Sequence, residues 1–254
     1  MSEPSPITLT SHDFQPRCFA LVPCAGVGER AGAGGPKQYH PVAGQAVVAH
    51  TLAALLAVPR LSATLVVLSP SDELFERHVP GFASERGWVA RVGGASRAES
   101  VCNGLAELLA RGAQPHDWVL VHDAARCLLR PEWVERLIEA CDGDEVGGLL
   151  ALPLADTLKA AMSGRAGEAR SRETVDRTAK WAAQTPQMFR LGLLQPALVG
   201  ALSDPATAAA VTDEASAIEM LGHAPRLVTG DFENIKVTWP GDFALAQRLL
   251  ATRP

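Results

Sequence analysis

Residues 19–39 have the sequence FALVPCAGVGERAGAGGPKQY, and this stretch indicates the fold of the chain. An apolar run typical of a buried strand ends at Pro23, and a glycine-rich loop with Arg30 and the pair Pro36-Lys37 follows it. Such a loop offers backbone N–H groups and two cations at the end of a strand, an arrangement that binds polyanions. We therefore expect a nucleoside triphosphate to bind here.

Three phosphate-binding loops compete for this pattern. A Walker A loop ends in Gly-Lys-Ser or Gly-Lys-Thr, which is missing here. Gly26, Gly28 and Ala31 fit the dinucleotide fingerprint, but no acid lies between Glu29 and Asp72 to hold a ribose, so NAD is a poor candidate. An open G-x-G-x-R…P-K loop around a triphosphate remains, with a ligand-free surface loop as the alternative.

Apolar, β-branched runs alternate with helical patterns along the rest of the chain. The expected strands are 18–23, 65–69, 88–92, 118–122, 146–152 and 226–229. Helices are predicted after the capping box of Ser96 and Glu99 and from Pro131. The alternation predicts an α/β fold with a mostly parallel sheet and helices on both faces. Loops at the carboxyl ends of the strands should form the site.

Composition and charge indicate one globular domain, which we expect to cover residues 18–254. Of the 254 residues, 47% are hydrophobic, and the net charge of −5 favours neither nucleic acid nor an anionic membrane as a partner. No apolar run is long enough to cross a membrane. Residues 1–17 lack the pattern of a signal peptide and are predicted to be a disordered extension. The five cysteines show no C-x-x-C spacing, which favours free thiols in a cytoplasmic protein.

Residues 153–180 interrupt the alternation of strands and helices. Short strand-like pieces flank a polar turn between Ser163 and Gly167. This pattern predicts a protruding β-hairpin. A two-stranded arm is hardly stable alone and tends to find a partner. A flexible surface hairpin is the alternative.

Motifs spread over residues 19–250 resemble those of one enzyme family. In order, they are PKQY, GGASRAESV, VHDAAR, ADTLK, TVDR, QTPQMF, TDEASAIE and NIKVT. The series is similar to the 2-C-methyl-D-erythritol 4-phosphate cytidylyltransferase family of the non-mevalonate isoprenoid pathway. The resemblance implies transfer of CMP from CTP to 2-C-methyl-D-erythritol 4-phosphate, giving 4-diphosphocytidyl-2-C-methyl-D-erythritol and pyrophosphate. It also implies a homodimer clasped by the β-arm.

The resemblance also implies which residues form the site. Catalytic roles are implied for Arg30, Lys37 and Lys236. We expect Lys236 to follow directly from a short strand and to point into the cleft beside the α-phosphate, with an outward-facing strand lysine as the alternative. Asp123, at the end of a predicted strand, suits Mg²⁺, although a turn or N-cap role is the alternative. Nucleotide contacts are expected from Cys24, Ala25, Gly26, Gly94, Ala95, Ser100, Asp123 and Arg126. Acceptor contacts are expected from Thr157, Arg177, Thr185 and Thr212.

Among these acceptor residues, Arg177 is expected to reach the site of the neighbouring subunit. Thr212, before Asp213 and Glu214, is also a credible N-cap. Two alternative functions stay open. A polyol-phosphate cytidylyltransferase that forms CDP-ribitol would share nearly all the nucleotide motifs, and a non-catalytic nucleotide-binding module would share the fold.

Overall fold

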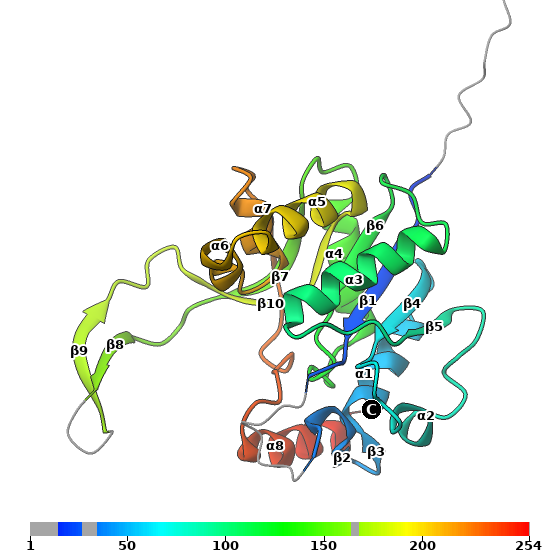
Figure 1. Cartoon of the computed structure of the whole chain (residues 1–254). Coiled ribbons are helices and arrows are strands. Elements are labelled where there is room, and N and C mark those ends of the chain that lie inside the picture. Colours follow the sequence, from blue (N-terminus) through cyan, green and yellow to red (C-terminus); the bar gives the residue numbers. More distant parts are fainter. Residues whose placement is uncertain (1–14, 27–34, 164–167, 254) are drawn as a thin grey trace, which may run out of the picture.

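The computed structural model describes residues 15–26, 35–163 and 168–253, and its centre is a seven-stranded sheet (Figure 1). The strand order is β11-β7-β10-β6-β1-β4-β5. Their bounds are β1 Cys18–Pro23, β4 Leu61–Val67, β5 Gly87–Ala90, β6 Trp118–Val121, β7 Gly147–Pro153, β10 Trp181–Arg190 and β11 Arg226–Thr229. All neighbouring pairs are parallel except those of β10 with β6 and β7. The predicted mostly parallel sheet is confirmed.

Helices cover both faces of the sheet. They are α1 Val47–Leu56, α2 Phe75–His78, α3 Arg97–Ala110, α4 Pro131–Cys141, α5 Leu191–Leu202, α6 Pro205–Ala210, α7 Glu214–Glu219 and α8 Pro240–Ala251. Along β1, Ala20 and Val22 pack with α1 and α4, while Phe19 and Leu21 pack with α3, α5 and α7. Successive side chains of a strand point to opposite faces, so one short strand contributes to two cores.

The sequence signals for helix starts agree with α3 and α4 but not with α7. The Ser96 side chain accepts a hydrogen bond from the Glu99 N–H at the start of α3, and Pro131 is the first residue of α4. At α7 the N-cap is Asp213, whose carboxylate accepts from the Ser216 N–H, and Thr212 lies one residue before it. The prediction of Thr212 as an N-cap is therefore wrong. A carboxylate caps a helix at least as well as a hydroxyl.

Strand β10 was not predicted, because it contains Pro186 and two glutamines. Pro usually excludes a segment from the interior of a sheet, since it cannot donate a backbone hydrogen bond. Here the pairing with β7 shifts register between Ala183 and Gln187, so Pro186 falls in the irregular part of the ladder. Thr185 lies in this irregular part, and its hydroxyl accepts from the Asp123 N–H, so β10 contributes to the loop that follows β6.

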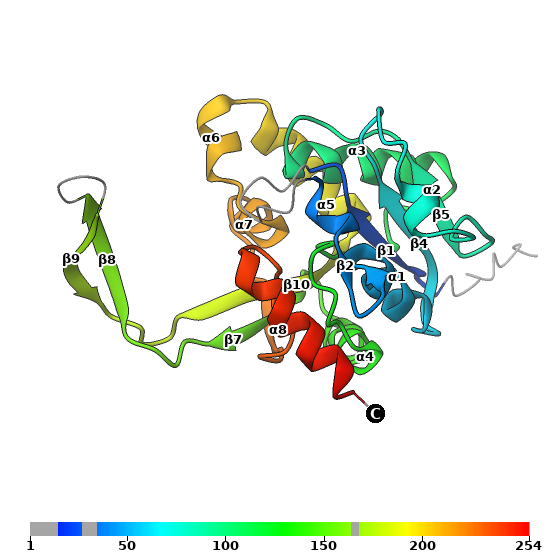
Figure 2. The same ribbon diagram turned by 90° about the horizontal axis from the view of Figure 1, so that it is seen from below.

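The predicted arm is a separate two-stranded antiparallel sheet that extends from the domain (Figure 2). It consists of β8 Leu158–Ser163 and β9 Ala169–Val175, and most of its side chains are exposed. The predicted turn at 164–167 lies outside the described residues.

The described part of the predicted N-terminal extension is attached to the domain. The Arg17 side chain donates to Asp117 at 2.8 Å, while residues 1–14 lie outside the described residues. Two smaller elements, η2 Lys37–Tyr39 and the β2–β3 pair Pro41–Val42 and Gln45–Ala46, follow the glycine-rich loop. Within the part of the chain that the structure describes, no helix is long and apolar enough to cross a membrane.

Candidate active site

A cavity of about 460 Å³ opens at the carboxyl ends of β1 and β6. Five segments line it: residues 23–26 after β1, residues 37–38 of η2, residues 94–100 at the start of α3, residues 123–125 after β6, and Lys236. The sheet topology explains why the loops after β1 and β6 line the same cavity, because neighbouring parallel strands place the loops that follow them at one edge of the sheet.

The cavity brings together most of the nucleotide-site residues expected from the sequence. The predicted residues in its lining are Cys24, Ala25, Gly26, Lys37, Gly94, Ala95, Ser100, Asp123 and Lys236. Arg126 does not line the cavity but lies buried behind it, where its Nη1 donates to the backbone carbonyl of Asn234. Arg30 lies outside the described residues.

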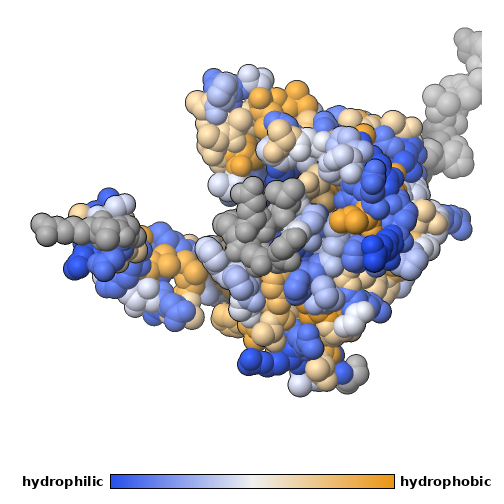
Figure 3. Space-filling view, turned by 60° about the horizontal axis from the view of Figure 1, so that its bottom comes forward, coloured by the Kyte–Doolittle hydropathy of each residue, from blue (hydrophilic) through white to orange (hydrophobic). Residues whose placement is uncertain are grey.

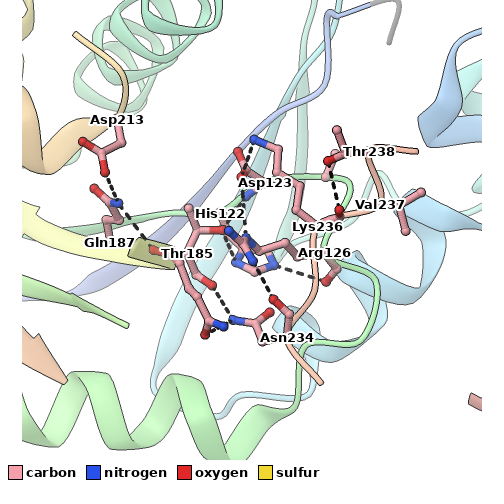
Figure 4. Close-up of polar contacts among 12 residues, drawn as sticks. His122, Asp123, Arg126, Thr185, Gln187, Asp213, Asn234, Lys236, Val237 and Thr238 are labelled. Atoms are coloured by element: carbon pink, nitrogen blue, oxygen red, sulfur yellow. Dashed lines mark hydrogen bonds and ion pairs between the residues drawn. The ribbon is translucent and has the colours of Figure 1, made fainter. Parts of the chain in front are cut away.

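Asp123 is the electrostatic centre of the cavity (Figure 4). Its Oδ1 accepts from Arg97 Nε at 2.9 Å, while Oδ2 lies 2.9 Å from Lys236 Nζ and 3.6 Å from Arg126 Nε. Burial acts to raise the pKa of this carboxyl group, but the three cations outweigh burial and hold the pKa well below its usual range. Asp123 is therefore an anion at any physiological pH.

The turn that carries Asp123 is held from behind by His122 and Thr185 (Figure 4). The Thr185 hydroxyl oxygen accepts from the Asp123 N–H at 3.0 Å and lies 3.1 Å from His122 Nδ1. Burial lowers the pKa of His122 to about 3, so the ring is neutral. His122 Nε2 lies 3.5 Å from the Arg126 carbonyl oxygen, which can only accept, so the ring proton resides on Nε2 and the Thr185 hydroxyl donates to Nδ1. The Thr185 hydroxyl, expected at the acceptor, is engaged within the protein.

Lys236 belongs to the loop between β11 and α8, and Lys37 is hydrogen-bonded to the same loop. Lys37 Nζ donates to the Val237 carbonyl at 2.8 Å, and the Val237 N–H donates to the Ala125 carbonyl at 2.9 Å. Lys236 lies in the loop between β11 and α8, so the expectation that it follows directly from a strand is wrong. Its side chain is 38% exposed. The loop thus connects both lysines to the residues after β6.

The two backbone segments expected to contact a base are fixed by the side chains of Gln38, which was not among the predicted site residues, and Ser100, which was. Gln38 Nε2 donates to the carbonyls of Cys24 and Gly26 at 3.1 and 2.9 Å. The Ser100 hydroxyl accepts from the Gly94 N–H at 3.1 Å. A side chain at Gly93 would start 2.4 Å from the Cβ of Ala25, so only glycine lets the two segments approach this closely.

Arg97 and Glu214 are the main residues that the sequence analysis missed. Arg97 Nη1 and Nη2 donate to the two carboxylate oxygens of Glu214 at 2.7 and 3.1 Å. The Glu214 side chain is only 1% exposed. Hydropathy patterns do not reveal this pair, because its members are 117 residues apart in the sequence. Buried acidic side chains are nearly always paired, so a partner for Glu214 can be expected once its burial is known.

The comparison with protein families decides the identity. The family model described as IspD: 2-C-methyl-D-erythritol 4-phosphate cytidylyltransferase matches residues 18–252. The chain belongs to this family.

Relatives within the cytidylyltransferase family are similar over nearly the whole chain. The 2-C-methyl-D-erythritol 4-phosphate cytidylyltransferase of Laribacter hongkongensis is 56% identical over 92% of this chain and 96% of its own length. The bifunctional enzyme IspD/IspF of Albidiferax ferrireducens is 53% identical over 98% of this chain, which spans only 56% of that relative.

Solved structures of the family share the fold. A crystal structure of 4-diphosphocytidyl-2C-methyl-D-erythritol synthase is 41% identical, with a TM-score of 0.79 over 93% of this chain and 99% of that one. The cytidylyltransferase of Thermus thermophilus is 32% identical, with a TM-score of 0.72 over 93% and 100%.

None of the four acceptor residues that the family resemblance implies lines the described part of the cavity, and Thr185 is buried behind it. Thr157 and Arg177 lie at the base of the arm, on either side of β8 and β9, and both are exposed. Thr212 is exposed in the turn before α7. Within one chain of this cytidylyltransferase, the nucleotide-site residues therefore gather around the cavity and the arm residues stay apart from it.

Proposed function

We propose that this chain transfers CMP from CTP to the phosphate of 2-C-methyl-D-erythritol 4-phosphate, in the synthesis of isoprenoid precursors. The observation that carries the proposal is the buried Asp123 carboxylate, held among cations in a cavity with glycine-rich backbone on its other side. A triphosphate needs cations and N–H groups around it, and an acceptor phosphate needs a path to its α-phosphorus.

The reaction is an in-line displacement. An oxygen of the acceptor phosphate attacks the α-phosphorus of CTP, the bond from that phosphorus to the bridging oxygen of the β-phosphate breaks, and pyrophosphate leaves with the electron pair. The attacking phosphate is already an anion, so the reaction needs no general base. The neutral, buried His122 accordingly supports the Asp123 turn through Thr185 and takes no part in proton transfer.

Lys236 is proposed to stabilise the transition state at the α-phosphate. It contacts Asp123 through a single nitrogen, and more than a third of its side chain is exposed. A flexible lysine can exchange one oxygen anion for another at little cost, whereas the forked Arg97 stays on its two carboxylates. Lys37, with Arg30 from the same motif, is proposed to hold the β- and γ-phosphates.

Asp123 is the group proposed to hold Mg²⁺. Among the described residues, no group of three His, Cys, Asp or Glu side chains could enclose a metal ion. Mg²⁺ is commonly held by one or two carboxylates together with substrate phosphates, so a single carboxylate in the cavity fits it. When bound, the ion would neutralise charge on the triphosphate. Asp123 would orient that ion while Arg97 keeps the carboxylate pointed into the cavity.

The cytosine ring is proposed to lie in the cavity, against the two segments that approach each other at Gly93. Backbone groups of Ala25, Gly26, Gly94 and Ala95 line the cavity there, together with Ser100. Because the Ser100 hydroxyl already accepts from the Gly94 N–H, its main contribution is to present the loop backbone. Backbone recognition does not depend on the side chains of Cys24 and Ala95, and Arg126 braces the Asp123 turn from behind.

The arm is proposed to clasp a second copy of the chain and to bring Arg177 and Thr157 to its neighbour's acceptor phosphate. Figure 3 shows the arm standing clear of the domain, with hydrophobic surface among hydrophilic side chains. Met162, on β8, is 54% exposed, which supports a partner on this hairpin. All the described cysteines are free thiols, which supports the cytoplasm as the proposed compartment.

Pyrophosphate release from CTP and Mg²⁺ tests the proposed function against its alternatives. We expect release with 2-C-methyl-D-erythritol 4-phosphate and much slower release with ribitol 5-phosphate. Release with ribitol 5-phosphate alone selects the CDP-ribitol enzyme. If neither acceptor gives pyrophosphate, the chain is a nucleotide-binding module instead.

Mixing two inactive variants tests the arm. Lys37→Ala and Arg177→Ala each damage a different half of a site that two chains share. After subunit exchange, we expect the mixture to regain part of the wild-type activity, because each mixed dimer holds one intact site. If the mixture stays inactive although mixed dimers form, Arg177 does not act across the interface.

A further inference from the structure

Arg97 lies where three parts of the site meet. It is the first residue of α3, directly after the loop that carries Gly94 and Ala95. Its Nε donates to Asp123 Oδ1 at 2.9 Å, while Nη1 and Nη2 reach the carboxylate of Glu214 at 2.7 and 3.1 Å. One guanidinium therefore joins the segment proposed to contact the base, the carboxylate of the cavity and helix α7.

The geometry of this contact makes Arg97 sensitive to the position of α7. A forked pair between arginine and a carboxylate fixes the plane of the guanidinium, which a lysine cannot do. Because both terminal nitrogens of Arg97 are held by the buried Glu214, only Nε remains for Asp123. The direction of the Asp123 carboxylate therefore depends on where α7 places Glu214.

Helix α7 begins in the turn that carries Thr212. Gln187 of β10 attaches this turn to the sheet: its Oε1 accepts from the Ala215 N–H at 2.8 Å and its Nε2 donates to Asp213 at 2.9 Å. Gln187 does not line the cavity, so its bonds hold α7 without contacting a ligand there. Glu214, next to this turn, contacts the cavity lining through the side chain of Arg97.

We propose that Arg97 and Glu214 form a positioning pair that couples the acceptor side of the site to the nucleotide side. This inference rests on the proposed function, with the nucleotide phosphates near Asp123, and on the expectation from the family resemblance that Thr212 contacts the acceptor. An acceptor that fixes the turn before α7 also fixes Glu214, Arg97 and the Asp123 carboxylate. Each ligand then raises the affinity for the other, and thermodynamic linkage requires the same factor in both directions.

Isothermal titration calorimetry measures this coupling. The two probes are α,β-methylene-CTP with Mg²⁺, in which the scissile oxygen is replaced by carbon, and 2-C-methyl-D-erythritol 4-phosphate. The dissociation constant of each probe is measured alone and with the other at saturation. For the wild type we expect the dissociation constant of each probe to fall about five-fold or more when the other probe is bound, by the same factor for both probes. For Arg97→Met and Glu214→Gln we expect a factor near one.

Arg91→Met is the matched control, because Arg91 Nη2 donates to both carboxylate oxygens of Glu76, at 2.6 and 2.8 Å, and this pair does not line the cavity. This variant should keep the full coupling. Near-ultraviolet circular dichroism checks that each variant is folded, and Glu214→Gln decides the question if Arg97→Met does not fold, since it preserves the side-chain volume.

A purely structural role for the pair gives a different result. Both dissociation constants would then rise in Arg97→Met and Glu214→Gln, while the coupling factor would stay at its wild-type value. This outcome overturns the inference. A wild-type factor near one overturns it as well. If the wild type binds neither probe, the proposed function fails instead, so the two failures are distinguishable.

Discussion

Replacing Asp123 with Asn removes the negative charge that three cationic side chains surround, while it keeps the shape of the side chain. Removing one partner of a buried ion pair costs about 3–5 kcal/mol of stability, because the other charge stays buried and unpaired. Asp123 and Arg126 are 8% and 11% exposed and fit this case, whereas Lys236 is 38% exposed and regains water. Arg97 keeps Glu214 as a partner. We therefore expect the lower end of the range, about 3 kcal/mol.

Urea unfolding at pH 7, followed by tryptophan fluorescence, measures this loss. With an m value of about 3 kcal/mol per M, the midpoint should fall by about 1 M. Asp117→Asn is the matched control, because Asp117 is also buried and paired, with Arg17, at the start of β6 rather than its end. Asp117→Asn should lose stability and keep the affinity for CTP, whereas Asp123→Asn should lose both stability and activity.

The pH dependence of the Asp123→Asn effect has a definite sign. The folded-state pKa of Asp123 is lowered, so its contribution is fully present above the unfolded pKa of about 4 and is lost as pH falls toward the folded value. The stability difference between wild type and Asp123→Asn should stay constant from about pH 5 to 8 and shrink below about pH 4. A difference under about 1 kcal/mol at pH 7, or one that grows on acidification, would refute the reasoning.

Substitutions at three further positions test other parts of the structure. Lys236→Ala should lower kcat by about 100-fold or more with a smaller effect on the KM for CTP, and a change in KM alone would remove Lys236 from the transition state. Thr185→Val should cost about 1–3 kcal/mol in urea unfolding, because the Asp123 N–H loses its acceptor, while Thr185→Ser should cost less. Gly104→Ala should cost about 1–3 kcal/mol without changing the kcat of folded protein, since its Cβ would lie 2.7 Å from a methyl group of Val67.

The sheet and the cavity could be predicted because the patterns that indicate them involve residues close together in the sequence. Apolar runs such as 118–122 and caps such as Ser96 depend on neighbours in the sequence, so they can be recognised there. The end of a parallel strand fixes where its loop emerges, which is why Asp123 and Gly26 were expected at one edge and line one cavity.

Contacts between distant segments could not be predicted in the same way. Strand β10 contains Pro186, and only the shifted pairing with β7 makes it compatible with a sheet. The pair of Arg97 and Glu214 depends on how α7 packs against α3 and α5, which no local pattern encodes. Thr185 matched an acceptor motif, yet its burial commits the hydroxyl to His122 and Asp123.

The central claim, that an acceptor phosphate displaces pyrophosphate from CTP in this cavity, is tested most directly by ³¹P NMR of the reaction products. With CTP, Mg²⁺ and 2-C-methyl-D-erythritol 4-phosphate, we predict that the monoester signal of the acceptor disappears as two coupled diphosphate signals and one equivalent of pyrophosphate appear. Lys236→Ala should slow all three changes equally. Unchanged CTP, or CMP and pyrophosphate without the coupled diphosphate signals, would contradict the claim.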